Sequence, residues 1–447
     1  MTIRRTYHAA LALGAIATST GLVACDRIKN PLLEVSTPDI VTPDKASSAA
    51  GAQSFFIAAQ GDFARLVGGD RGGSSPLGLN LTGGLLADEL ISTRTGTEHI
   101  DNRSIVPATF PADSWRQVGA AHTRITRAIK ALEAFPPATG GNDQLALLHA
   151  YEGMTLVLVA EHYCNGVPLW NGESDLNPAT KTFSTAELYN AAIAEFNKAL
   201  SLTQVTNTVN FATIGKARAT LDAATPATLA ASAASAAALV AAIPTDYKFN
   251  VVFGSSTAGV GNAIYDWANS TKNFGAVDKE GGNGLDYISS GDPRIKVDPT
   301  KVSAGQDGTR TPALNQYPKL DAPVTVASGI EARMIQAESE LANGNPNWIN
   351  TLNSARATIG LGPLVPAATA AGQVDQLFRE RGFWMYLTAH RLGDMRRLVR
   401  QYGRGIETVY PTGSYFKGGT YGTDAVLPPH QDEFNNPNWS GCTDKAP

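Results

Sequence analysis

Apolar residues recur at the spacing of helix faces along most of this chain. In the N-terminal half the period predicts helices at 46–66, from Asp113 onward, and at 143–163, 184–202, 212–223 and 227–242. Ser184 and Glu187 have the spacing of a capping box at the start of one of them. Residues 68–85 are rich in Gly and Ser, which indicates a loop. We therefore expect a mainly helical N-terminal half.

The helix at 184–202 has the pattern of the second helix of a tetratricopeptide repeat. Its alanines allow neighbouring helices to approach closely, while the rings of Tyr189 and Phe196 fill the groove between them. Further along, helices at 330–342 and 346–359 form a hairpin of repeat size, and one long helix is expected at 374–402. The sequence thus predicts an all-α fold, a tetratricopeptide-like superhelix.

The helical period stops between residues 244 and 325. This stretch is rich in Gly, Asn, Asp, Pro and aromatic residues and has no sustained period, which favours an irregular, loop-rich insertion. The expected organisation is a signal segment (1–24), an acylated N-terminus with a tether (25–45), an N-terminal helical-repeat part (46–243), the insertion (244–325), and a C-terminal helical part with a tail (326–447).

The N-terminus has the pattern of an export signal. Arg4 and Arg5 precede an uncharged stretch that ends in Leu-Val-Ala-Cys, and this ending resembles the lipobox of bacterial lipoproteins. We therefore predict acylation of Cys25, which would anchor the chain to a membrane. The alternative is an ordinary signal peptide that carries a cysteine by chance.

Charge and cysteine content narrow the picture further. Loss of residues 1–24 would leave a net charge of about −6, which argues against nucleic acid as a partner. Besides Cys25 the chain has only Cys164 and Cys442. Because an exported protein meets oxidising conditions, these two either form a disulfide or remain unrelated thiols.

Motifs of common catalytic sites do not occur in the sequence: there is no His-Glu-x-x-His, Gly-x-Ser-x-Gly, P-loop or Cys-x-x-Cys. We therefore predict no catalytic residues, no cofactor and no metal site. Asp88 and Glu89 could act as paired carboxylates, but adjacent side chains seldom converge on one substrate atom. A solvated or hydrogen-bonded loop acid is the alternative that we favour.

Four stretches resemble the SusD/RagB family in their order and spacing. They are the helix that ends in Asn-Gly-Val-Pro-Leu (150–169), the Tyr-x3-Ile-x2-Phe-x-Lys-Ala-Leu helix (189–200), the AEA-type helix with its Leu-Asn-x-Ala-Arg partner (331–356), and the Glu-Arg, Arg-x-x-Asp-Met-Arg-Arg and Pro-Pro-x3-Glu-x3-Pro series (380–437). His390, Met395 and Cys164 depart from the family pattern, which bears on the subfamily.

The resemblance implies a surface-exposed lipoprotein of the outer membrane. Such a protein would bind a glycan, an oligosaccharide or a peptide and deliver it to a SusC-like, TonB-dependent barrel transporter, without acting as an enzyme. A helical-repeat scaffold for envelope assembly without small-molecule cargo is the first alternative. A surface hydrolase is a weaker one, because its motifs are missing.

Aromatic side chains among polar ones in the insertion suggest where a ligand would bind. Sugar rings offer apolar faces and hydroxyl edges, so their sites combine aromatic platforms with polar groups on loops. We therefore name Tyr265, Trp267 and Tyr287 as candidate ligand-binding residues. The alternative for each ring is packing of the insertion onto the helical body.

Charged residues cluster on the predicted last helix at spacings that allow ion pairs, such as Asp394 with Arg397 or Arg391. The cluster comprises Glu380, Arg381, Arg391, Asp394 and Arg397. We expect a structural ion-pair network that locks this helix to the scaffold, with ligand contact as the alternative.

Overall fold

The computed structural model describes residues 47–70, 77–107, 112–170, 180–255 and 260–447. The predicted signal segment, the tether and Cys25 lie outside these ranges. Among the described residues, no helix is both long enough and apolar enough to cross a membrane.

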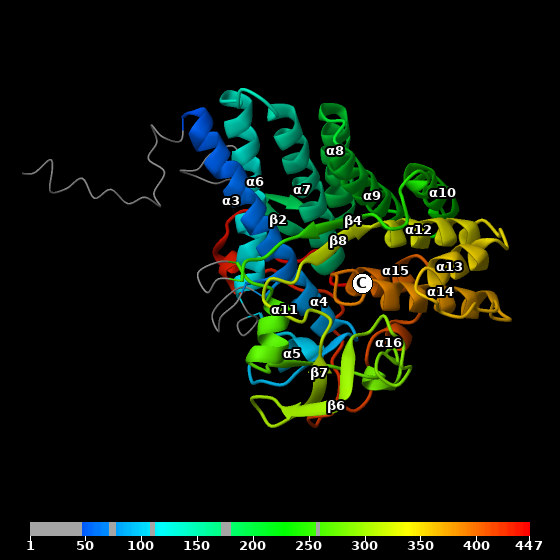
Figure 1. Cartoon of the computed structure of the whole chain (residues 1–447). Coiled ribbons are helices and arrows are strands. Elements are labelled where there is room, and N and C mark those ends of the chain that lie inside the picture. The colour runs from blue at the N-terminus through cyan, green and yellow to red at the C-terminus, as the bar shows by residue number, and fades with distance from the viewer. Residues whose placement is uncertain (1–46, 71–76, 108–111, 171–179, 256–259) are drawn as a thin grey trace, which may run out of the picture.

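Helices that pack side by side form the main body. In the N-terminal half they are α3 (Ala49–Gly68), α6 (Ala112–Ala134), α7 (Gly141–His162), α8 (Thr185–Leu202), α9 (Thr206–Asp222) and α10 (Leu229–Val240). Each of these helices packs on the next, and α10 packs on α12 (Gly329–Ala342), which packs on α13 (Trp348–Ala357). Figure 1 shows this row of helices across the upper half of the molecule. The predicted all-α, tetratricopeptide-like fold is confirmed.

The capping box at the start of α8 forms as the sequence predicts. The N–H of Glu187 donates to Ser184 Oγ at 3.2 Å, and the N–H of Ser184 donates to Glu187 Oε2 at 2.9 Å. Tyr189 and Phe196 of this helix are buried. The local cap and the apolar stripe therefore account for both the start of α8 and the face that it buries.

A short helix, α4 (Leu79–Leu86), replaces part of the loop predicted at 68–85. Every residue of α4 is buried, including both glycines and the polar Asn80 and Thr82. Since a helix buried on all sides needs no polar face, its sequence carries no amphipathic period. That is why the prediction missed it.

The single long helix predicted at 374–402 was wrong: the structure has two helices, α14 (Ala370–Trp384) and α15 (Arg391–Arg400). Between them Leu387 and Ala389 adopt positive φ angles of 56° and 64°. The N–H of Leu387 donates to the Glu89 carboxyl at 2.8 Å, and Tyr317 donates to the Leu387 carbonyl at 3.0 Å. Partners distant in sequence thus hold the break open.

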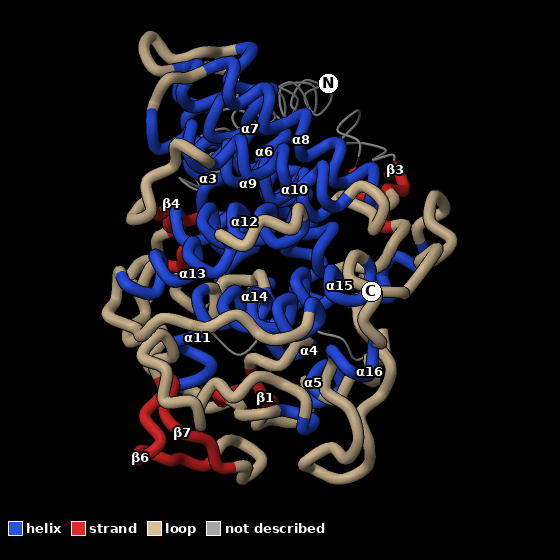
Figure 2. Tube along the Cα trace, turned by 90° about the vertical axis from the view of Figure 1, so that its right-hand side faces the viewer, coloured by secondary structure: helices blue, strands red, loops and turns tan. Residues whose placement is uncertain are grey.

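The region predicted as an irregular insertion contains short regular elements. They are β4 (Lys248–Val251), α11 (Ala263–Tyr265), the π-helical turn η1 (Asp266–Ser270), β5 (Phe274–Ala276), the 3-10 turn η2 (Glu280–Gly282), β6 (Val297–Ala304), β7 (Arg310–Leu314) and, across its C-terminal limit, β8 (Val324–Ser328). β6 and β7 form an antiparallel hairpin, which Figure 2 shows at the end of the molecule away from α7 and α8.

One other strand pair ties this region to an earlier part of the chain, because β5 pairs with β1 (Leu90–Ser92). β4 pairs with β8 at the two ends of the region, and β2 (Val167–Trp170) pairs with β3 (Thr180–Phe183) outside it. The remaining elements are α5 (Glu98–Asp101), α16 (Ile406–Val409) and the 3-10 turn η3 (Gln431–Asn435). Since β1 and β5 are far apart in sequence, as are β4 and β8, no local pattern reveals these two pairings.

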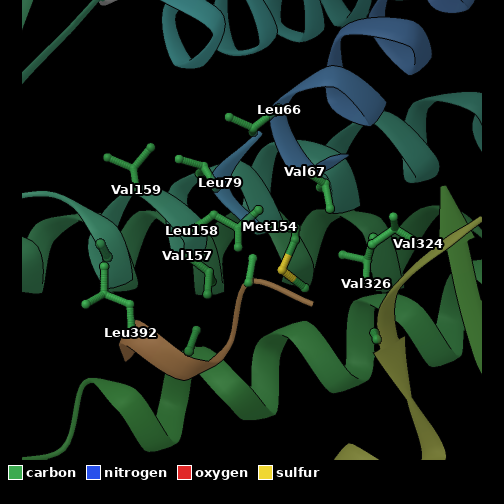
Figure 3. Close-up of a cluster of buried hydrophobic side chains, with 14 of the residues drawn as sticks. Leu66, Val67, Leu79, Met154, Val157, Leu158, Val159, Val324, Val326 and Leu392 are labelled. Carbon is green, nitrogen blue, oxygen red and sulfur yellow. The ribbon is translucent and has the colours of Figure 1, made fainter. Parts of the chain in front are cut away.

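One hydrophobic core runs through the helical body and the strand region. Figure 3 shows its centre, where side chains from α3, α4, α7, β8 and α15 meet: Leu66, Val67, Leu79, Met154, Val157, Leu158, Val159, Val324, Val326 and Leu392. The strand region is thus packed into the body and has no separate core of its own among these residues.

Cys164 and Cys442 form a disulfide, with their Cα atoms 5.9 Å apart. Backbone hydrogen bonds accompany it, because Asn165 donates to Asp444 at 3.0 Å and Thr443 donates to Asn165 at 2.8 Å. The C-terminal tail is thereby fixed to the segment that follows α7.

Candidate ligand-binding cavity

A cavity of about 360 Å³ lies in the region that the sequence predicted as an insertion. It is formed between residues 287–299, which lead into β6 and are called the cavity segment below, and the end of β7. Its walls combine apolar and polar groups: Tyr287, Ile288, Gly291, Asp292, Pro293, Ile295, Lys296, Val297, Pro299 and Asn315. A volume of this size lies within the ordinary range for small-molecule sites.

Local hydrogen bonds shape the segment that forms the cavity. The Asp278 carboxylate accepts the N–H groups of Ile288 and Ser289, both at 2.8 Å. Gly291 turns the chain with a φ of 64°, a region in which glycine is free of strain. On the opposite side, the N–H of Asn315 donates to the carbonyl of Lys296 at 2.6 Å. The β6–β7 pairing therefore closes the cavity with a residue that is distant in sequence.

Arg294 fixes the cavity segment to the helical body. Its guanidinium donates to both Asp292 oxygens at 2.9 and 2.7 Å and to Glu380 of α14 at 2.6 Å. Glu380 also accepts Arg356 of α13 at 2.7 Å. Burial alone would raise the pKa of Asp292, but the hydrogen bonds from Arg294 outweigh it and lower that pKa below its ordinary value. Asp292 is therefore a paired carboxylate at neutral pH.

Of the three predicted ligand-binding residues, only Tyr287 lines the cavity. Its ring is buried between Phe383, at 5.2 Å, and Tyr386, at 4.7 Å between centroids. Both of these rings belong to the helical body. Tyr287 therefore also packs the strand-and-loop region onto that body, which was the alternative to ligand binding.

The other two predicted residues lie elsewhere. Trp267 is buried, stacked on Phe274 at 5.4 Å, with the Arg94 guanidinium 5.0 Å above its ring. Tyr265 is half-buried and packs against the core. Neither residue lines the cavity.

Sequence reasoning missed the remaining lining residues. The last aromatic candidate named from the sequence is Tyr287, whereas Pro293, Ile295 and Lys296 lie a few residues beyond it. A search for mixed apolar and polar residues beyond the aromatic ones would have included these. Asn315 has no such signal, since only the hairpin brings it to the cavity.

The charged cluster forms a buried ion-pair network, as the structural interpretation expected. Arg381 binds Asp394 at 2.7 Å, Arg391 binds Asp88 at 2.6 Å, and Arg397 binds Glu338 and Asp222. The expected pair of Asp394 with Arg397 is only a secondary contact at 3.7 Å, and Arg391 takes a different acid. All these groups are buried, and none of them lines the cavity.

Asp88 and Glu89 diverge in the structure. Asp88 accepts Arg391 and the N–H of Leu285, while Glu89 accepts the N–H of Leu387. Burial raises the pKa of Glu89 to about 8, so this carboxyl is protonated at neutral pH. Both carboxyl groups are hydrogen-bonded, which agrees with the alternative that we favoured from the sequence, but both are buried and not solvated. Over the described ranges, no three His, Cys, Asp or Glu side chains gather to hold a metal ion.

The geometry defines the chain as a helical-repeat protein with a ligand-sized cavity in a strand-and-loop region packed on its side. No protein-family model matches the sequence, and neither does any curated protein. Solved structures do match. A SusD superfamily protein from Bacteroides thetaiotaomicron aligns over 88% of this chain and 99% of its own, with a TM-score of 0.67 and 13% identity.

Two further structures carry names that mention ligands. A SusD-like carbohydrate binding protein from Bacteroides vulgatus covers 80% of this chain and 84% of its own, with a TM-score of 0.60 and 13% identity. Surface glycan-binding protein A from Bacteroides uniformis covers 88% and 99%, with a TM-score of 0.59 and 14% identity. The chain therefore has the SusD fold, and the resemblance seen in its sequence is confirmed at the level of the fold.

Proposed function

We propose that this chain is a lipid-anchored protein of the outer membrane that captures a nutrient, a glycan, oligosaccharide or peptide, and passes it to a SusC-like, TonB-dependent transporter. The observation that carries the proposal is the SusD fold over nearly nine-tenths of the chain, together with a cavity in its strand-and-loop region. The names of two structural neighbours favour a carbohydrate.

The cavity suits such a ligand. Apolar side chains such as Ile288, Pro293 and Val297 can pack on one face of a sugar ring, while Lys296 and Asn315 supply donors for its hydroxyl edge. Arg294 ties the segment to α14, so little ordering is needed when a ligand binds. Binding requires no chemistry from these groups, and none is part of the proposal.

Calorimetric titration with a panel of oligosaccharides and peptides tests the binding step. Asn315 is exposed, and no side-chain partner is recorded for it among the described residues, so Asn315→Ala removes ligand contacts without disturbing the fold. We expect this variant to bind about fivefold to tenfold more weakly, the loss of one hydrogen bond. Asn207→Ala, an exposed position on α9, serves as the matched control and should bind like the parent.

The same titrations separate the proposal from its alternatives. A scaffold without cargo would bind nothing in the panel, and a surface hydrolase would release shortened products during incubation. Binding that is equal in Asn315→Ala and in the parent would move the site away from this cavity.

Affinity purification from detergent-solubilised membranes tests the transporter step. A tagged full-length chain should recover a large barrel protein in stoichiometric amount. Recovery of the tagged chain alone, under conditions in which other membrane complexes survive, would contradict this part of the proposal.

A further inference from the structure

The cavity contains a positive charge that no nearby acid neutralises. Lys296 is exposed and lines the cavity, and its ammonium donates a hydrogen bond to the carbonyl of Pro293. Asp298, which follows two residues later, is paired with Lys301 at 3.2 Å. No carboxylate of the described residues forms an ion pair with Lys296.

The acid that also lines the cavity is already occupied. Asp292 receives three hydrogen bonds from Arg294, one from its N–H and two from its guanidinium, all between 2.7 and 2.9 Å. Arg294 and Arg356 together face Asp292 and Glu380, so these four groups balance one another. Of the two charged residues that line the cavity, Asp292 and Lys296, only Lys296 therefore has no ion-pair partner among the described residues.

Resting on the proposed function, we propose that this cavity binds an acidic sugar unit, a ring that carries a carboxylate or sulfate group. The anion would lie against the Lys296 ammonium, and the apolar face of the ring against Ile288 and Val297. A neutral sugar could accept a hydrogen bond from the ammonium but would offer it no opposite charge, which favours the acidic ligand.

The volume of the cavity agrees with a single unit of a longer chain. About 360 Å³ accommodates one substituted pyranose ring, and the cavity is open on one side to solvent through exposed residues such as Gly291 and Pro299. A terminal or internal residue of an oligosaccharide could therefore enter while its neighbours remain outside.

Calorimetry with three oligosaccharides of equal length tests the inference: an oligogalacturonate, a sulfated galactan fragment and a neutral galacto-oligosaccharide. The parent should bind at least one of the two anionic probes about tenfold more tightly than the neutral one. The two anionic probes distinguish a carboxylate from a sulfate. Raising NaCl from 50 to 300 mM should weaken the anionic complex and leave the neutral one almost unchanged.

Lys296→Gln isolates the charge, and Lys248→Gln, at an exposed position of β4 outside the cavity lining, is its matched control with the same charge change. We expect Lys296→Gln to bind the anionic probe about fivefold to twentyfold more weakly and the neutral probe within twofold of the parent. Lys248→Gln should bind both as the parent does. Thermal unfolding checks that both variants fold.

Three results would overturn the inference: equal affinity of the parent for neutral and anionic probes, unchanged anionic binding in Lys296→Gln, or binding of peptides alone. In each of these the proposed nutrient-binding function survives. Failure of the parent to bind any oligosaccharide or peptide would remove that function as well as the inference.

Discussion

At the scale of single residues, one aromatic ring that lies directly against the backbone of two neighbouring helices explains how the helical body packs. Phe196 of α8 is fully buried, and its ring lies against Gly153 of α7 and Gly215 of α9. A Cβ atom on Gly215 would come within 2.3 Å of this ring, and one on Gly153 within 2.9 Å. The ring therefore uses space that only glycine leaves on the two neighbouring helices. The sequence predicted the role of Phe196 but not these glycines.

Gly215→Ala should lower the free energy of unfolding by about 1 to 3 kcal/mol, because overpacking outweighs the gain in helix propensity. Gly119→Ala is the control, since Gly119 lies inside α6 with no atom within 4 Å of its ideal Cβ. There the same substitution should raise stability by up to about 1 kcal/mol. Chemical denaturation measures both. Equal effects of the two substitutions would contradict the close packing around Phe196.

Because the carboxyl group of Glu89 is buried, we expect the free energy of unfolding to depend on pH. Its pKa rises from an ordinary 4.5 to about 8 on folding because of burial. The folded state therefore holds a proton that the unfolded chain has lost, so the contribution of Glu89 is fully present below pH 4.5 and is lost as the pH rises towards 8. Glu89→Gln cannot ionise and should gain stability relative to the parent between pH 5 and pH 8, by on the order of 3 kcal/mol.

Thermal unfolding of parent and variant across this pH range measures the difference. Gln retains an oxygen that can accept the N–H of Leu387, so the hydrogen bond at the start of the α14–α15 break is preserved. A stability difference that does not vary with pH would show that Glu89 titrates normally in the folded protein.

At the scale of elements, the sequence predicted helices where apolar residues recur at helical spacing over a long segment. α3, α7, α8, α10, α12 and α13 begin and end within a few residues of their predicted limits, and α6 begins where its start was predicted. The failures have a different origin. α4 has no polar face, and the break between α14 and α15 depends on Glu89 and Tyr317, which lie far away in sequence. Both features depend on tertiary contacts, and the spacing of apolar residues within one short segment gives no information about such contacts.

The C-terminal tail offers a prediction at this scale. The disulfide joins residues 278 positions apart, so it restricts the unfolded chain over a very long loop. Cys442→Ser should therefore lower the free energy of unfolding by about 2 to 4 kcal/mol. A reducing agent should lower the melting temperature of the parent to that of the variant and leave the variant unchanged. Titration of free thiols in the denatured, non-reduced chain gives an independent check: two reactive thiols at 164 and 442 would exclude the bridge.

At the scale of the whole molecule, buried ion pairs connect helices that are distant in sequence. Arg218 of α9 binds Glu161 of α7, Arg397 of α15 binds Glu338 of α12, and Arg391 binds Asp88. Breaking such a pair leaves a buried charge without a partner, which costs several kcal/mol. The network therefore fixes how the two helical parts and the strand region are oriented, and it holds the cavity segment through Glu380.

The predicted anchor belongs to this scale as well. Cys25→Ser should move the chain from the membrane fraction to the soluble fraction, because a multiply acylated cysteine is the proposed attachment. Cys442→Ser, which removes a different cysteine, should remain in the membrane fraction. Fractionation followed by immunoblotting measures both variants. Retention of Cys25→Ser in the membrane fraction at the parental level would refute lipid anchoring at this position.

The sequence by itself determined the helical character of the chain, the repeat-like packing of Tyr189 and Phe196, and the region in which a cavity occurs. These follow from local periodicity and composition, which act between residues a few positions apart. Only the tertiary structure decided which side chains line the cavity, because the β6–β7 pairing brings Asn315 to Lys296 and Arg294 docks on Glu380 of α14. Ring faces such as that of Trp267 are covered or left open by partners distant in sequence, so their exposure is a property of the folded molecule.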